Sequence, residues 1–238
     1  MAAPGFPLNL ACLALIWGWW GPATAQITPS GLGTRVNGNT FGRCSAGSCA
    51  IQGGVKTGAN LFQRFGSFDT RHGITDVKVD VQGQANVIFG VVGPQGFFLN
   101  TPLRLTTPAN LFVLSPRGIW LGSGASFANV PNLLLSTSFA LGIGAERFDL
   151  FGASADAVSS LSGSPAAPWA QRGEAGLAFG GQGAITLAGG LISVDRHLVI
   201  DAGSGPIRAP GAAATTLRSG ESVRLSGGAV ELNGVALE

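Results

Sequence analysis

The sequence is poor in charge: Asp, Glu, Lys and Arg make up 11% of its residues, and only Lys56 and Lys78 are lysines. Ordinary globular domains carry roughly 25% charged residues. A helical protein exposes Lys, Glu, Arg and Gln on its outer faces, so this shortage argues against an α-helical fold. The basic residues are also scattered singly, without a cluster that could follow a phosphate backbone, and we therefore expect no binding of nucleic acid.

The sequence also lacks the signatures of common catalytic and cofactor sites. Its glycine-rich segments have no Lys followed by Ser or Thr, which a phosphate-binding loop needs, and nothing marks a nucleophile elbow. The only histidines, His72 and His197, are far apart and show no zinc-ligand spacing. Asp76 and Asp80 would share a strand face, where an acid/base pair could form. No further acid shares their segment, so we interpret them as a solvated face and expect no catalytic residue, cofactor or metal.

Glycine, by contrast, is abundant at 38 of 238 residues, about 16% against an average near 7%. Hydrophobic residues make up 45% of the chain, which therefore is not a disordered linker. After residue 25 the apolar residues form short runs typical of β-strands, separated by Gly, Asn, Pro and Ser. The best candidate for a helix is the segment 149–160. The segment 162–169 contains two prolines and is predicted to be a loop that projects from the body of the domain. The strand-like runs are 76–81, 86–89, 110–114, 119–121, 184–187, 191–194, 198–200, 223–225 and 229–232.

A parallel β-helix accounts best for this pattern. A β-sandwich usually has fewer glycines and cleaner hairpins, whereas a β-helix stacks coils whose apolar residues point into a narrow interior and whose corners favour glycine. With coils of roughly 20 residues, the 213 residues after position 25 would form on the order of ten coils, fewer after loops. We predict an all-β fold over 26–238, a single right-handed parallel β-helix with an N-terminal cap and extruded loops.

The first 25 residues have the pattern of a signal peptide. Their apolar run, 8–20, is too short for a membrane span of about 20 residues. Ala-Thr-Ala follows at 23–25, and these small residues predict cleavage between Ala25 and Gln26. The segment before the run has no Lys or Arg, so an uncleaved membrane anchor is the alternative. We expect residues 1–25 to direct export to the periplasm and 26–238 to form one domain.

Two cysteines follow the predicted cleavage site, Cys44 and Cys49. An exported chain meets an oxidising periplasm, so we expect a disulfide between them. The intervening Ser, Ala and Gly residues allow so short a loop to close, and its loss of chain entropy corresponds to about 2 kcal/mol. A zinc site is the alternative, and it would need two further ligands that the sequence does not supply.

Four segments resemble, in order, the secretion domain of two-partner-secretion exoproteins, which include filamentous haemagglutinins and contact-dependent inhibition toxins. Residues 58–65, Gly-Ala-Asn-Leu-Phe-Gln-Arg-Phe, resemble that family's G-x-N-L-F-H-S-F segment. Residues 86–93 resemble its N-I-I-x-R-V-T-G segment, and 109–119 resemble A-N-L-F-L-I-N-P-N-G-I. Residues 122–136 then follow like the family's F-G-x-x-A continuation. The rest of the chain, towards the C-terminus, resembles the family only in its β-helix-like pattern of short strands and turns.

This resemblance implies that the domain engages the periplasmic modules of a cognate outer-membrane pore protein, crosses that membrane unfolded and folds outside. Ser-Pro-Arg-Gly at 115–118 replaces the family's Asn-Pro-Asn-Gly and still meets the needs of a type I turn. Gln63 and Arg64 replace its His-Ser. The residues carried over as candidates for secretion and partner recognition are Asn60, Leu61, Phe62, Asn110, Leu111, Phe112, Ser115, Pro116, Arg117 and Gly118.

Three functions stay open at this point. The first is a non-enzymatic exoprotein, secreted or attached to the cell surface, that serves adhesion, with host-cell or surface carbohydrate as a candidate ligand. The alternatives are a β-helical polysaccharide-active enzyme and a stand-alone carbohydrate-binding surface module. For Asn60 and Asn110 the sequence equally supports partner recognition and a structural role in stacking along β-helix corners.

Overall fold

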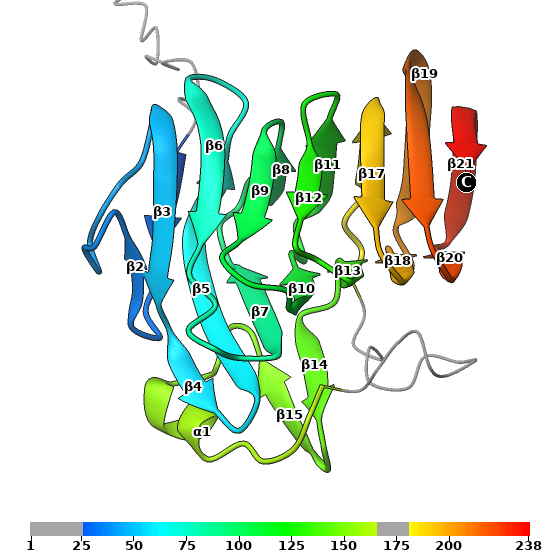
Figure 1. Ribbon diagram of the computed structural model, residues 1–238. Helices are drawn as coiled ribbons and strands as arrows, with labels where there is room; N and C mark the ends of the chain where they lie inside the picture. The colour runs from blue at the N-terminus through cyan, green and yellow to red at the C-terminus, as the bar shows by residue number, and fades with distance from the viewer. Residues whose placement is uncertain (1–25, 166–180) are drawn as a thin grey trace, which may run out of the picture.

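A computed structural model describes residues 26–165 and 181–238 of the chain, and it confirms the all-β parallel β-helix, with about seven turns. Each central coil contributes three strands, one to each face of the stack (Figure 1). One complete coil runs through β6 (Ile74–Val79), β7 (Asn86–Val91) and β8 (Phe97–Leu99). The next coil runs through β9 (Pro102–Leu105), β10 (Asn110–Leu114) and β11 (Ile119–Gly122).

The three faces are built by parallel pairing between successive coils. The first face belongs to a five-stranded sheet of β2 (Thr34–Val36), β3 (Gly47–Gly53), β6, β9 and β12 (Ser126–Ala128). The second and third faces belong to a 14-stranded sheet and meet in the long strand β5 (Asn60–Asp69). The second face continues from β5 through β7, β10, β13 (Asn132–Ser136), β18 (His197–Asp201) and β20 (Ser222–Ser226). The third continues through β8, β11, β16 (Ile185–Ala188) and the first parts of β19 (Pro206–Ser219) and β21 (Ala229–Leu237). The last part of β19 lies on the first face, where it pairs with β17 (Gly190–Val194), and β17 lies beside β12 (Figure 1).

The N-terminal end of the stack is covered by antiparallel strands. Strand β1 (Gln26–Pro29) and strand β4 (Val55–Thr57) both pair antiparallel with β5, and β2 pairs antiparallel with β3. Figure 1 shows β2 beside β3 at the left end of the stack, and β4 beside β5. They occupy edges that parallel coils would leave unpaired, and they therefore form the predicted N-terminal cap.

The coils are longer than the roughly 20 residues expected from the sequence. Hydrogen-bonded asparagines on successive coils are separated by 26, 24 and 22 residues rather than about 20. In addition, the segment between β13 and β16 leaves the stack of coils, and we call it the excursion. It contains β14 (Ala140–Ile143), β15 (Glu146–Asp149) and the short helix α1 (Ala155–Ser159). Together these differences reduce the estimate of ten coils to about seven.

The helical candidate at 149–160 contains only α1, whose N-cap Ser154 accepts a hydrogen bond from the backbone N–H of Ala157. The predicted loop at 162–169 lies partly outside the described residues, and the predicted signal peptide lies wholly outside them. Within 26–165 and 181–238, no helix has the length and apolar character needed to span a membrane.

The interior of the stack is filled by alternate residues of each strand. Leu111, Val113, Ile119 and Leu121, which recur with the period of two that a strand gives to one of its faces, are all buried in this inner core. In the first coils the core is aromatic: the ring centroids of Phe68 and Phe97 are 4.5 Å apart, and Phe65 and Phe89 pack against Phe68. Burying side chains of this size is the main stabilising contribution in a chain with few surface charges.

A second core lies on the outside of the helix, against the face formed by β5, β7, β10, β13 and β18. The excursion folds back over this face, where β14, β15 and α1 gather beside β5 and β7 (Figure 1). The rings of Phe62 and Phe148 are 4.9 Å apart across the contact. The buried residues of this outer core are Leu32, Phe62, Ile88, Phe112, Leu114, Leu134, Leu141, Ile143, Phe148, Leu150, Val158, Leu161 and Val199.

Candidate secretion and recognition site

The family-like segments, separate in the sequence, lie on consecutive coils in a common register. Asn60 of β5 pairs with Asn86 of β7, and Asn86 pairs with Asn110 of β10. The first three segments therefore form one continuous block on the second face, immediately after the N-terminal cap. The fourth segment brings β13 beside β10, with Leu111 in register with Leu133.

The asparagines that begin these strands form a hydrogen-bonded ladder. The Nδ2 of Asn60 donates to the carbonyl of Gly163 at 2.8 Å. Asn86 then donates to Asn60 Oδ1 at 2.9 Å, and Asn110 to Asn86 Oδ1 at 2.8 Å. Asn132 donates to Asn110 Oδ1 at 2.7 Å. Each interior amide both donates and accepts, which keeps a row of polar side chains satisfied at a buried corner.

The ladder shows how the structure uses the candidate asparagines. Asn60 is fully buried and Asn110 is half-buried, so both take the structural position that the sequence analysis weighed against recognition. Asn86 and Asn132 belong to the same row and were not among the residues predicted from the sequence. The recurrence of Asn before an apolar strand at the coil period is the signal that would have identified them.

The apolar candidates are buried in two different places. Leu61 and Leu111 point into the inner core, whereas Phe62 and Phe112 point outward beneath the excursion. Strand β10 is also paired on both sides, with β7 and with β13. The folded domain therefore does not present these side chains or this backbone to another protein.

The tetrapeptide at 115–118 forms the predicted turn. The N–H of Gly118 donates to the carbonyl of Ser115 at 3.0 Å, and the Ser115 hydroxyl donates to the Gly118 carbonyl at 2.8 Å. Arg117 has a negative φ, which excludes a type II turn and fits the expected type I. Gly118 has φ = 122°, and a Cβ there would lie 2.9 Å from the Ala184 carbonyl oxygen of the next coil. This corner therefore needs glycine both for its backbone conformation and for the close stacking of coils.

The two departures from the family pattern, Gln63 and Arg64, fasten neighbouring parts of the domain to β5. The side chain of Gln63 is buried and donates to the carbonyl of Gly53 at 2.9 Å. Arg64 Nε donates to the Ser30 carbonyl in the cap at 2.5 Å, and its Nη1 donates to the Ala153 carbonyl in the excursion at 2.9 Å. Burial lowers the pKa of Arg64. Arg64 thus joins the N-terminal cap to the excursion through carbonyl acceptors.

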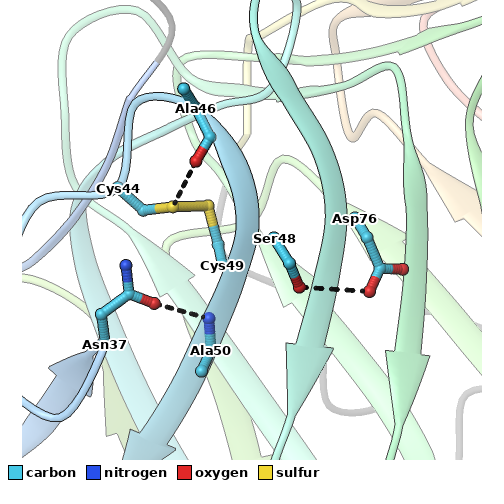
Figure 2. Close-up of a disulfide and its surroundings, with 7 residues drawn as sticks. All are labelled: Asn37, Cys44, Ala46, Ser48, Cys49, Ala50 and Asp76. Atoms are coloured by element: carbon cyan, nitrogen blue, oxygen red, sulfur yellow. Dashed lines mark hydrogen bonds between the residues drawn. A yellow bond between two sulfur atoms is a disulfide. The ribbon is translucent and has the colours of Figure 1, made fainter.

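The disulfide predicted between Cys44 and Cys49 is present, with Cα atoms 5.8 Å apart (Figure 2). Both cysteines are buried in the inner core under the cap. The Sγ of Cys44 lies 3.7 Å from the Ala46 carbonyl oxygen, and because oxidised sulfur carries no hydrogen this is a contact only. Asn37 accepts a hydrogen bond from the Ala50 N–H at 2.9 Å and holds the preceding loop against β3.

The acidic residues considered as a catalytic pair are engaged separately. Asp76 Oδ1 is 3.0 Å from Arg104 Nε on the next coil, so Asp76 has a basic partner that was not predicted from the sequence. Asp80 accepts a hydrogen bond from the backbone N–H of Gln82 at 3.0 Å. Among the described residues, no three His, Cys, Asp or Glu side chains group as metal ligands would.

A polar cluster near the C-terminus contains a serine, a histidine and a carboxylate. His197 Nδ1 is 2.9 Å from Ser222 Oγ, and His197 Nε2 is 3.0 Å from Glu221 Oε2. A hydrogen bond from Arg196 lowers the pKa of Glu221, and the same bond raises the pKa of Arg196. The Ser222 N–H donates to the Arg196 carbonyl, so it is not available to stabilise an oxyanion. Asn132, His197 and Ser222 are in register, so the cluster continues the corner along which the asparagines stack.

Among solved structures, the chain is similar to the crystal structure of a filamentous hemagglutinin secretion domain, with 15% sequence identity and a TM-score of 0.30. The match covers 89% of this chain and 96% of that domain. No family model matches the chain. No curated protein matches it either. The fold assignment therefore rests on the strand pairing described above.

Proposed function

We propose that this protein is an exported, non-enzymatic exoprotein of the two-partner-secretion type, whose β-helix directs passage through a cognate outer-membrane pore. One observation carries the proposal. The three most distinctive family-like segments, 58–65, 86–93 and 109–119, stack in register on consecutive coils directly after the N-terminal cap. Segments matched by chance would have no reason to share one face and one register.

The partner is the set of periplasmic modules of that pore protein, and these modules bind the chain before it folds. The reason is burial: in the folded domain Asn60 and Phe62 are inaccessible, and β5 is paired along its length with β4, β7, β8 and β1. An extended segment can instead be captured by strand addition to a sheet edge. Backbone hydrogen bonds then supply affinity, while side chains such as Phe62 and Phe112 supply selectivity.

Export to the periplasm requires the signal peptide at residues 1–25, with cleavage between Ala25 and Gln26. After crossing the outer membrane, the domain folds at the cell surface or in the medium and serves adhesion. Intact-mass measurement of the secreted protein should show a chain that begins at Gln26. A mass that includes residues 1–25 would favour the membrane-anchor alternative.

Two other functions share this fold and predict different observations. A polysaccharide-active enzyme needs converging carboxylates in a groove, whereas Asp76 here is paired with Arg104. A stand-alone carbohydrate-binding module needs no dedicated pore and would reach the cell surface without one. Dependence on the pore therefore separates two-partner secretion from the stand-alone module.

The decisive experiment is a secretion assay in strains with and without the cognate pore protein. It is paired with binding of the unfolded chain to the purified periplasmic modules. We expect secretion only with the pore, and we expect Asn60→Ile to weaken binding of the unfolded chain. Equal secretion from both strains would refute two-partner secretion.

A second variant separates capture from folding. Pro116→Ala combined with Gly118→Val alters the turn and places a β-branched residue at φ = 122°. This variant should bind the periplasmic modules like the unmodified chain, yet yield a secreted product that proteases degrade. If it loses binding as completely as Asn60→Ile, then segment-specific capture is wrong.

A further inference from the structure

The third face of the β-helix carries a partly exposed aromatic strip. Phe98 of β8, Trp120 of β11 and Thr186 of β16 occupy the same register on successive strands and are all partly exposed. The rings of Phe98 and Trp120 have centroids 6.0 Å apart. Their neighbours along the strands, such as Phe97 and Ile119, point into the inner core, so Phe98 and Trp120 point outward.

The indole of Trp120 lies along the strand over Gly122 rather than projecting away from it. A Cβ at Gly122 would lie 2.5 Å from Cη2 and 2.6 Å from Cζ3 of the ring. It would also lie 2.1 Å from Asn100 Oδ1, so the Asn100 amide borders the same spot. Gly122 thereby provides the space for the indole, and the ring is held in place before any ligand arrives. Such preorganisation reduces the entropy lost on binding.

Hydrogen-bonding groups lie beside the two rings of the strip. Arg71 Cζ stacks 3.9 Å from the Phe98 ring centroid, while Asp69 holds the Nε and Nη2 of the same guanidinium. Among the hydrogen bonds of the described residues, Arg71 Nη1 takes part in none and stays available as a donor. Asn100 uses Oδ1 to accept from the Gly124 N–H at 3.2 Å, which leaves its Nδ2 for a ligand. On the neighbouring strand β16, Thr186 is in register with Trp120, on the side away from Phe98.

The charges on this face are balanced. Asp69 neutralises Arg71 at 2.6 Å, and Arg208, the residue after Thr186 in the same register, pairs with Glu231 at 3.6 Å. A face without net charge offers little attraction to an acidic polymer. A protein partner would need roughly 800 Å² with a buried apolar centre, whereas this strip is narrow and edged with polar groups. A flat aromatic ring surrounded by a few oriented hydrogen-bonding groups suits a sugar ring, which has apolar C–H faces and hydroxyls at its edge.

We propose that Trp120, with Phe98, Asn100, Arg71 and Thr186 around it, is a binding site for the hexose rings of a neutral polysaccharide. The proposal specifies the ligand class for the adhesion role and rests on that part of the proposed function, because secretion brings this face into contact with surface glycans. Secretion itself does not require the site, so the two proposals can fail separately.

The binding test uses the secreted chain. Only Trp120 and Trp169 are tryptophans in residues 26–238, so Trp169→Phe leaves Trp120 as the sole fluorescent reporter in the cleaved chain. The probes are the neutral oligosaccharides maltohexaose, cellohexaose and mannohexaose, with heparin as the acidic comparison. We expect at least one neutral probe to change the Trp120 emission in a saturable way. We also expect saturation-transfer NMR to show its ring protons in contact with the protein.

Variants locate the contact. Trp120→Ala should weaken binding, measured by calorimetry, by roughly tenfold or more, and Trp120→Phe should restore part of it. Phe41→Ala is the control, because Phe41 is an aromatic residue that is 95% exposed in the cap loop. Unchanged affinity in a folded Trp120→Ala variant would overturn the proposal. So would binding of heparin alone, or no binding of any neutral probe at about 1 mM. None of these results would bear on pore-dependent secretion.

Discussion

Replacing Asn86 with alanine tests whether the asparagine ladder stabilises the domain. Asn86 lies in the middle of the ladder, is only 6% exposed, and makes one hydrogen bond in each direction. Its removal leaves Asn60 Oδ1 without a donor at a fully buried position. It also leaves Asn110 Nδ2 without an acceptor at a half-buried one. The strand itself should persist, because Val87 and Phe89 still anchor β7 in the inner core.

The expected cost follows from these two groups. A buried polar group that loses its partner costs about 1–3 kcal/mol. Asn60 Oδ1 should incur most of that cost, whereas water can partly satisfy Asn110 Nδ2. The sum is about 2–4 kcal/mol, a large part of the roughly 5–15 kcal/mol that stabilises a typical domain. The control is Asn233→Ala, since Asn233 is an exposed strand asparagine outside the ladder; it should change stability by less than about 0.5 kcal/mol.

The measurement is urea denaturation followed by circular dichroism and by fluorescence, because stacked coils can unfold in parts and the two probes must coincide. A double-mutant cycle with Asn60→Ala should show coupling, since Asn60 and Asn86 share a hydrogen bond. If Asn86→Ala costs no more than Asn233→Ala, or if the cycle shows no coupling, the ladder does not contribute in the way described.

Two further predictions concern the cross-link and the outer core. Replacing both Cys44 and Cys49 with alanine should lower the free energy of unfolding by about 2 kcal/mol for the lost loop constraint, and equal urea midpoints for the two proteins would contradict this. Leu150 packs against Gly90, where a Cβ would lie 2.0 Å from Leu150 Cδ1. Leu150→Ala should therefore cost about 2–5 kcal/mol and make 140–165 the first site of limited proteolysis; initial cleavage elsewhere would show that the excursion does not depend on this contact.

The sequence predicts the coils because each coil repeats the same local pattern. A short alternating strand buries every second side chain, and a glycine or a Ser-Pro-x-Gly turn follows, so the pattern alone identifies strands such as β6 and β10. Inward-facing residues such as Leu111 and Leu121 follow from the period of two. The resemblance to secretion domains selects the same segments, and their common register on the second face is consistent with it.

The outer core could not be predicted in the same way. Phe62 and Phe112 have the same hydrophobic character as the inward residues, and alternation places them on the outside, where a solvated face would be expected. Their burial depends on residues 140–165, whose path back over β5 and β7 leaves no periodic signal in the sequence. Likewise, the partners of Arg64 in the cap and in the excursion are distant in sequence, so only the fold brings their carbonyls together.

The order of these segments in the chain bears on the proposed capture step. Phe62, Ile88 and Phe112 all precede residues 140–165, which cover them in the folded domain. In a chain that emerges N-terminus first, these three side chains are therefore exposed until residues 140–165 have folded over them. The same apolar side chains can then serve a partner early and the outer core later, without a separate recognition surface. Leu150→Ala tests this order with the purified periplasmic modules, because a loosened excursion should slow the burial of Phe62, Ile88 and Phe112 during refolding in vitro. The refolding variant should then stay able to bind the modules for longer than the unmodified chain. An unchanged binding period would show that the excursion does not cover the segments that the modules capture.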